Sequence, residues 1–525
     1  MCFVMNIIEW KQDKIKGVLS TFDRIIIKGY SRQLSNIKQM GYFLSHNNVL
    51  LKDFGTYAEN VTKSLCSHIE SLASNNNRPY KFIYGNNEDK GNIARQILEE
   101  NPIEEGLICI LSNIEVCSTM NIFKNKLNKK LELKWDKRKC KYYYLYYLDR
   151  DFGFMHIKIQ SWFPFMVQVY INGHEWLKQQ LTKENMKFEM YNNSFSYIED
   201  IEKAQSIADK IVDSKISDKF DAMIKEINNF LPVIEETFSR TYYWCLAECE
   251  YSTDIIHDSR ESIDEYFKEL VEKSYHTFNC KDVMSFFGRK LKDTGFQFKG
   301  EINTSLLKRN QGFRIKHKMK SNQLKMYDKG FCVRIETTIN DPREFKVLKD
   351  ATKIVNHKEL VNYKKWEPMG KSIANLYRYA EVCKAVNNRY INALPIPTGR
   401  DNAIKKLTNI SNSITVNDRK YTGFNLFNKD DIRLFEVLSN ASLIINGFTN
   451  KILRSRYFKD EEDCNSKKIR DKTTRIIDKL RKHRIIKKVG RASKYYVTES
   501  GREMLNYYYL YQNKEIPEYL KSINN

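Results

Sequence analysis

One tyrosine lies among cations and close in sequence to a carboxylate. Tyr327 belongs to the segment Lys325–Lys329 (KMYDK), and a turn leads to the next predicted strand, which carries Arg334–Glu336 (RIE). The phenolate oxygen of a tyrosine can attack a phosphodiester if a metal held by carboxylates polarises the phosphate and cations stabilise charge in the transition state. We therefore predict Tyr327 as a nucleophile and Glu336 as a catalytic carboxylate. The alternative is that Tyr327, one of 32 tyrosines, packs against a neighbouring strand.

Two acidic residues have a spacing that suits metal binding. The stretch Tyr242–Ile256 predicts a helix, on which Glu250 and Asp254 are four residues apart and share one face. Carboxylates are ligands that Mg²⁺ and similar cations prefer, so we predict that Glu250, Asp254 and Glu336 hold Mg²⁺ or Mn²⁺. The alternative is a surface helix whose acids pair with Lys or Arg. The sequence has no GxxxxGK[ST] or GxGxxG motif, so no nucleotide cofactor is predicted.

His156 is a further catalytic candidate. The segment Phe154–Gln160 alternates apolar and polar residues, which predicts a strand with His156, Lys158 and Gln160 on one face. Three hydrogen-bonding side chains on one face suit a binding or catalytic sheet. The alternative is an antiparallel sheet with one solvated face.

Cations alternate with apolar residues in the segment before Tyr327. Thr304–Lys329 contains eight Lys or Arg and one Asp, and its alternation predicts a strand with a row of cations on one face. Such a row suits contact with a phosphate backbone. The predicted nucleic-acid contacts of this region are Arg314, Lys316, Lys318, Lys320, Lys325, Lys329 and Arg334. A second basic stretch, Lys124–Lys139, is either a connector or a long basic hairpin.

The C-terminal residues show a pattern of three helices followed by a hairpin. Apolar periodicity predicts helices over 430–438, 447–455 and 466–483, and two short strands flank a turn at 490–492. Cys464–Thr498 contains thirteen Lys or Arg and two Asp. This order, and the string RIIDKLRKHRIIKKVGRASKYYVTESGREML, resemble the winged-helix domains of bacterial transcription regulators.

A winged helix places its third helix in the major groove and its wing against the backbone. On the third helix, Thr473, Thr474 and Arg475 are therefore predicted to reach base edges or phosphates. Phosphate contacts are predicted for Arg481, Lys487, Lys488, Arg491 and Lys494. The alternative is that this module contacts another protein.

Longer strings carry two further resemblances. FDRIIIKG, GFMHIKIQSWFPF, YYWCLAECEYSTDI and LKMYDKGFCVRIETTIN, with the C-terminal module, resemble a widespread, uncharacterised bacterial protein family. The pairing of Tyr-Asp-Lys with Arg-x-Glu around Tyr327 is similar to the catalytic stretch of rolling-circle replication initiators. This resemblance implies Tyr327 as the nucleophile and Glu336 as a metal-site carboxylate. The chain departs from initiators that have a His-hydrophobic-His strand, because it has only His156-Ile157-Lys158.

Length, charge and composition set the wider expectations. A chain of 525 residues suggests about three domains, and its net charge of +23 favours a polyanionic partner. We predict an α+β multidomain protein with an N-terminal α/β layer (1–123), a central antiparallel β-sheet with helices (124–397), a linker (398–428) and a C-terminal winged helix-turn-helix (429–525). No apolar run approaches the ~20 residues of a membrane span, and the 11 cysteines show no paired spacing. We therefore predict a cytoplasmic protein with no membrane partner.

The function expected from these features is nucleic-acid binding, with DNA as the first partner and RNA as the alternative. The initiator-like motif predicts a DNA-processing enzyme that nicks and joins DNA through Tyr327 and is encoded by a mobile element. The alternative is a non-catalytic DNA- or RNA-binding protein or transcription regulator. The sequence makes no prediction of the oligomeric state.

Overall fold

The computed structural model describes residues 7–10, 12–85, 88–214, 216–239, 242–289, 300–309, 312–355, 359–394, 407–460, 465–489, 493–510 and 512. The chain divides into two compact units. Unit 1 contains residues 1–18, 253–337 and 383–525, and unit 2 contains residues 19–252 and 338–382. Each unit is therefore built from segments that are far apart in the sequence.

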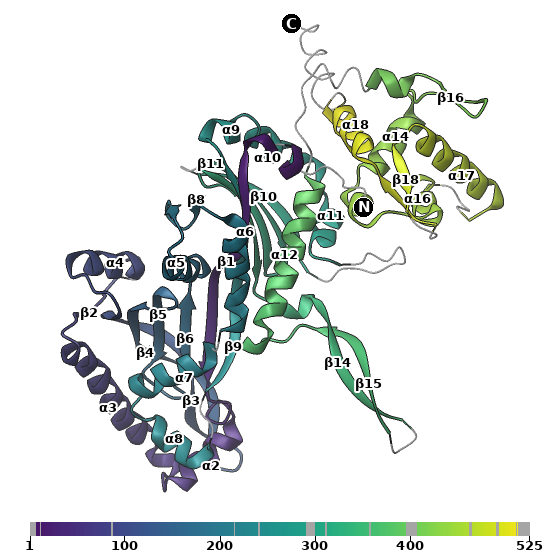
Figure 1. The fold of residues 1–525 in the computed structure, drawn as a ribbon. Helices are drawn as coiled ribbons and strands as arrows, with labels where there is room; N and C mark the ends of the chain where they lie inside the picture. The colour runs from purple at the N-terminus through teal and green to yellow at the C-terminus, as the bar shows by residue number, and fades with distance from the viewer. Residues whose placement is uncertain are drawn as a thin grey trace, which may run out of the picture. The chain divides into compact units, whose positions relative to one another are not determined.

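An eleven-stranded mixed sheet is the main β structure, and Figure 1 shows its strands. Its order is β10-β11-β12-β13-β9-β1-β6-β5-β4-β3-β2, and β2 is parallel to β3, whereas β3, β4, β5, β6 and β1 pair antiparallel in turn. The strands are β1 (Ile15–Tyr30), β2 (Tyr80–Phe82), β3 (Gly106–Lys124), β4 (Leu131–Asp149), β5 (Gly153–Gln160), β6 (Val167–Ile171), β9 (Tyr243–His257), β10 (Ile302–Arg309), β11 (Gly312–Met319), β12 (Asn322–Asp328) and β13 (Cys332–Ile339). The predicted mixture of helices and sheet is confirmed. The strands of the predicted N-terminal layer (1–123) and those of the predicted central region (124–397) that belong to the main sheet lie in one eleven-stranded sheet.

The chain builds the sheet from two segments with the same order of elements. β1 is followed by helices and then by β3, β4, β5 and β6, which are neighbours in that order, and β6 lies beside β1. β9 is likewise followed by helices and then by β10 to β13, and β13 lies beside β9. β1 and β9 are neighbours, and β1, β9 and β13 each have residues in both units. In the strand order these three strands lie side by side near the middle of the sheet, and we call them the central strands.

The helices of unit 2 are amphipathic and begin at polar caps. In α3 the buried residues Leu65, Ile69 and Leu72 recur at helical spacing, and the side chain of Asn172 caps α5. The helices are α2 (Ile37–His46), α3 (Phe54–Asn75), α4 (Lys90–Glu100), α5 (Gly173–Lys183), α6 (Ile201–Ala208), α7 (Ile216–Ile227) and α8 (Leu231–Phe238). Two small hairpins, β7–β8 (Phe188–Met190, Phe195–Ile198) and β14–β15 (Lys346–Val355, Glu359–Pro368), belong to the same unit. Figure 1 shows β14 and β15 as a narrow two-stranded arm.

The basic stretch at 124–139 forms part of a hairpin rather than a connector. β3 and β4 each have 19 residues and pair from Gly106↔Leu148 to Lys124↔Leu131. Residues 125–130 form the turn between them. The hairpin alternative is therefore confirmed.

One face of the sheet in unit 1 is apolar and covered by helices. His317 of β11 is fully buried and contacts Phe278 of α10, Phe286 of α11 and Tyr390 of α12. The helices are α9 (Arg260–Asp264), α10 (Phe267–Thr277) with Phe278 at its C-cap, α11 (Cys280–Phe286) and α12 (Leu376–Ala393), whose last residues belong to this unit. Side chains of β11 and β12 alternate between buried and half-buried. The buried ones face the helices, and the half-buried ones, many of them polar, lie on the opposite face of the two strands.

The C-terminal residues form a helical cluster with a short hairpin. α17 buries Ile469, Thr473, Ile477 and Leu480 along one stripe. The elements are a short hairpin of β16 (Ile414–Val416) and β17 (Arg419–Tyr421), then α14 (Lys429–Leu438), α15 (Ala441–Asn446), α16 (Asn450–Tyr457), α17 (Lys467–Lys482), β18 (Ile486–Lys488), β19 (Tyr495–Val497) and α18 (Glu499–Leu510). The short α1 (Ile7–Trp10) also belongs to unit 1. Among the described residues, no helix has the length and apolar character needed to cross a bilayer.

Candidate active site

The predicted row of cations lies on the polar face of β11 and β12. Arg314, Lys316 and Lys318 pair across the two strands with Tyr327, Lys325 and Gln323. Directly paired residues share a face, so these six side chains lie on one face of the sheet. Arg314, Lys316, Lys318 and Lys325 are half-buried there, whereas Lys320 and Lys329 occupy the turns at the strand ends.

Tyr327 and Glu336 are in direct contact. The Tyr327 hydroxyl donates a hydrogen bond to Oε2 of Glu336 at 2.6 Å, and Nζ of Lys325 donates to Oε1 at 2.6 Å. Glu336 is 2% exposed, and the guanidinium of Arg314 lies 6.0 Å from the centre of the Tyr327 ring. A phenol that donates to a buried carboxylate has the geometry of a nucleophile and its general base. The structure therefore brings together the two residues predicted to carry out the chemistry.

Arg334 and Asp254 bind each other. Nε of Arg334 donates to Oδ1 of Asp254 at 2.6 Å, and its NH2 group donates to Oδ2 at 2.7 Å. Both side chains are 1% exposed. The prediction that Arg334 contacts nucleic acid is therefore wrong, because the guanidinium is enclosed within the protein. Asp254 was predicted as a metal ligand, but both of its oxygens receive hydrogen bonds from Arg334, and it is not among the described carboxylates whose oxygens lie within 4.8 Å of one another.

Glu250 lies on a strand and not on a helix. The segment Tyr243–His257 is the strand β9, and most of its side chains are buried. The prediction of a helix that carries Glu250 and Asp254 on one face is therefore wrong. Glu250 accepts a hydrogen bond from the Thr338 hydroxyl at 3.0 Å and forms an ion pair with Arg24 at 3.1 Å. Burial opposes the charge of Arg24 most strongly, but the carboxylates of Glu250 and Glu248 outweigh it and raise the pKa of Arg24.

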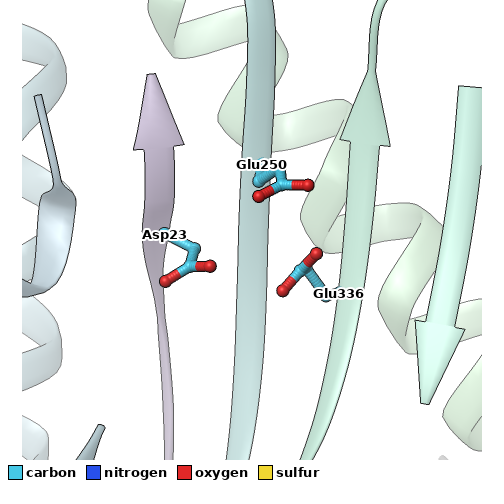
Figure 2. Close-up of side chains that lie close together, drawn as sticks. All are labelled: Asp23, Glu250 and Glu336. Carbon is cyan, nitrogen blue, oxygen red and sulfur yellow. The ribbon is translucent and has the colours of Figure 1, made fainter. Parts of the chain in front are cut away.

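A carboxylate cluster lies on the three central strands. Asp23 of β1, Glu250 of β9 and Glu336 of β13 each contribute one oxygen, and these oxygens lie within 4.8 Å of one another. Figure 2 shows the three carboxylates turned toward a common region. An all-oxygen set of this kind suits Mg²⁺ or Mn²⁺. Each carboxylate also has a protein partner, since Arg24 pairs with Glu250, Lys325 with Glu336 and His174 with Asp23 at 3.3 Å.

Asp23 was not among the residues predicted from the sequence. A carboxylate between Phe22 and the apolar run Ile25–Ile27 is the signal that could have identified it, because a charged residue in a buried strand requires a partner. Its partners come from distant segments, since Asn193 also donates to it. Sequence spacing alone therefore does not show the contact.

His156 does not join this cluster. It lies on β5, and β6, β1 and β9 separate that strand from β13 in the sheet. Its ring stacks on Tyr170 at 5.1 Å, and burial lowers the pKa of His156 to about 4. The histidine is therefore neutral at pH 7 and is part of an aromatic layer on the sheet.

Most of the cations predicted in the C-terminal elements are accessible. Thr474, Arg475, Arg481 and Lys488 are exposed, and Lys487 and Lys494 are half-buried. Thr473 is fully buried and its hydroxyl donates to the carbonyl of Ile469 at 2.7 Å, so the prediction that it reaches nucleic acid is wrong. Arg491 lies outside the described residues.

Comparison with known proteins adds no relative to this description. No protein-family model, curated protein or solved structure matches the chain. The chemistry of the cluster therefore has to be argued from its own residues.

Proposed function

We propose that this chain is a DNA-processing protein that cleaves a phosphodiester through Tyr327. The observation that carries the proposal is the 2.6 Å hydrogen bond from the Tyr327 hydroxyl to Glu336, on a face that also presents Arg314, Lys316 and Lys325. Tyr327 transfers its proton to Glu336, and its oxygen forms a bond to phosphorus. The bond from phosphorus to the leaving sugar oxygen breaks, and that oxygen takes up a proton. The reverse reaction rejoins the strand and frees the tyrosine.

The carboxylate cluster supports a role for Mg²⁺ or Mn²⁺ in this proposal. Asp23, Glu250 and Glu336 would hold the ion, and the ion would polarise the phosphate. Lys325 and Arg24 already offset part of the negative charge of these acids. Binding of the ion therefore requires that Glu336 and Glu250 share their oxygens between a metal and a cationic side chain.

The C-terminal elements would hold the DNA. We infer that α14, α16 and α17 with the β18–β19 hairpin form a winged helix, with α17 as the helix that enters the major groove. The exposed side of α17 carries Lys467, Lys468, Arg470, Lys472 and Arg475, and among the described residues none of these forms an ion pair. Such cations are available to phosphates, which supply affinity rather than sequence preference.

The second candidate is a non-catalytic nucleic-acid-binding protein. It is favoured by the pairing of each carboxylate in the cluster with a protein group, since acids that are paired in this way do not require a metal. The two candidates differ in one product. Only the enzyme forms a covalent bond between DNA and Tyr327.

The test is the formation of a covalent protein–DNA adduct. The protein is incubated with supercoiled DNA and with single-stranded DNA, in Mg²⁺ or Mn²⁺, and the products are denatured before electrophoresis. We expect an adduct with the wild type and with the control Tyr197→Phe, whose side chain is 40% exposed on β8. We expect none with Tyr327→Phe. An adduct with Tyr327→Phe would contradict the proposal, and binding without an adduct across varied DNA would favour the second candidate.

A further inference from the structure

The end of the β3–β4 hairpin extends beyond the rest of the sheet. β5 pairs with β4 only as far as Tyr142, and β2 pairs with β3 only as far as Ser112. We call residues 114–141 the outer ribbon. Within it, the register runs from Ile114↔Lys141 to Lys124↔Leu131, which is eleven residue pairs or roughly 35 Å. All of these residues belong to unit 2.

The outer ribbon carries an unusual number of unpaired cations. Lys134 pairs with Glu132 at 3.2 Å and Lys141 with Glu70 at 2.8 Å, whereas the guanidinium of Arg138 lies 3.5 Å from the centre of the Trp162 ring. Among the described residues, the other six cations form no ion pair: Lys124, Lys126, Lys129, Lys130, Lys137 and Lys139. By contrast, Lys318 and Lys325 on β11 and β12 pair with Glu301 and Glu336.

The turn of the outer ribbon holds its lysines in a defined arrangement. The Asn125 side chain accepts a hydrogen bond from the amide of Leu127 at 2.9 Å, and Asn128 accepts one from the amide of Lys130 at 2.9 Å. The amide of Asn125 also donates to the carbonyl of Lys130 at 2.8 Å, which closes the turn. Side-chain caps of this kind fix a turn without tertiary packing. Lys126, Lys129 and Lys130 are therefore exposed on an ordered turn.

The two faces of the ribbon differ near its base. On one face, Cys117 and Cys140 are buried. On the other face, Val116 lies opposite Lys139 and Ser118 opposite Lys137, and all four side chains are exposed. Val116 is 61% exposed, which is unusual for a β-branched residue in a strand. An open face of lysines with aliphatic residues between them is suited to a partner that is both anionic and large.

We propose that the outer ribbon binds the phosphate backbone of duplex DNA. Charge complementarity carries this proposal, because six lysines within sixteen residues form no ion pair with the described residues. The ribbon shares no residue with the predicted contacts on β11, β12 and α17, which belong to unit 1. The inference rests on the proposed function only in that the polyanion is a nucleic acid.

Duplex DNA fits this surface better than a single strand does. Proteins that bind single strands stack successive bases on aromatic side chains. The exposed apolar residues beside the ribbon's lysines are mainly aliphatic. Ile114, Val116, Leu127 and Leu131 are exposed, and the exposed aromatic residues of the described ribbon are Phe123 and Trp135. Aliphatic side chains do not stack on bases. Lysines spaced along an extended ribbon match instead the regular phosphates of a duplex.

The test compares two triple substitutions in the full-length protein. The ribbon variant carries Lys126→Gln, Lys129→Gln and Lys130→Gln. The control variant carries Lys178→Gln, Lys187→Gln and Lys210→Gln, which removes the same charge elsewhere in unit 2. Circular dichroism confirms that both variants fold. The affinity for a duplex DNA fragment, a single strand of the same sequence and a duplex RNA is then measured between 50 and 200 mM salt.

Log affinity falls with log salt with a slope of about −0.9 per phosphate contact, so the loss of three contacts makes the slope shallower by about 2.7. At 0.1 M salt this corresponds to a loss of up to about 500-fold in affinity for duplex DNA. The control variant is expected to keep the wild-type slope. Equal slopes in the ribbon variant and the wild type would overturn the ribbon assignment and leave the proposed function standing. A loss confined to single strands or RNA would overturn the duplex assignment, and a wild type that binds no nucleic acid would overturn both proposals.

Discussion

The buried pair of Arg334 and Asp254 gives a prediction that separates a structural role from a metal-binding role. Asp254→Asn keeps the size of the side chain but removes its charge, so the Arg334 guanidinium is left buried against a neutral amide. Both side chains are 1% exposed and are joined by two short hydrogen bonds. Removal of one partner from such a pair costs about 3–5 kcal/mol, because an uncompensated charge stays away from water.

Hydrogen exchange of the two strands is the suitable assay, because a chain with two compact units need not unfold in one step. A loss of about 3–5 kcal/mol raises the exchange rate of protected amides in β9 and β13 by about 10²- to 10³-fold or more. The control is Asp264→Asn, which removes the partner of Arg260 in a pair whose side chains are 42% and 58% exposed. An exposed pair of this kind contributes less than about 1 kcal/mol.

A double substitution tests the reasoning further. Arg334→Met with Asp254→Leu removes both charges, so no buried charge is left without a partner. We expect it to cost less than Asp254→Asn alone, since apolar replacement of a buried pair is often neutral. The reasoning is refuted if Asp254→Asn exchanges like the wild type without metal but loses protection that Mg²⁺ confers on the wild type. That outcome would make Asp254 a metal ligand.

Three further predictions follow from buried groups. Burial raises the pKa of Asp282 to about 6, so between pH 4 and 6 the folded chain keeps a proton that the unfolded chain releases, and stability falls as pH rises. Asp282→Asn should remove that slope in urea unfolding; parallel pH curves for the variant and the wild type would contradict this. Burial lowers the pKa of His317 to about 3. As the pH falls below about 6.5, only the unfolded chain gains the proton, so the folded chain loses stability. His317→Gln should therefore unfold less readily in acid than the wild type. Gly173→Ala places a Cβ 2.2 Å from the carbonyl oxygen of Phe22 and should lower thermal stability by about 1–3 kcal/mol; an unchanged melting temperature would show that the backbone yields freely.

Several local elements could be predicted because their physical cause lies in neighbouring residues. The alternation in β5, β11 and β12 follows from a sheet with one buried face, and the turn at Lys329–Gly330 follows from glycine at a positive φ of 96°. The buried stripe of α17 likewise repeats at helical spacing. The sequence also placed Tyr327 and Glu336 on adjacent strands, which is why their contact could be expected.

β9 was predicted wrongly because both of its faces are buried. A strand that is covered on both sides loses the alternation that identifies strands, and its acidic residues then look like those of an exposed helix. Glu250 and Asp254 are tolerated in β9 because Arg24 and Arg334 arrive from neighbouring strands. Those arginines are distant in the sequence, so no local pattern reports them.

The order of residue types along the chain determined which segments become strands and helices, where cations concentrate, and that Tyr327 has an acid within reach. Tertiary structure alone decided which charges neutralise one another. Arg334 is the buried counter-ion of Asp254, and Asp23 lies near Glu250 and Glu336. The six lysines of the outer ribbon that form no ion pair are exposed. The reason is that ion pairing depends on distances of a few ångströms between atoms, and those distances are set by strand order and register rather than by position in the sequence.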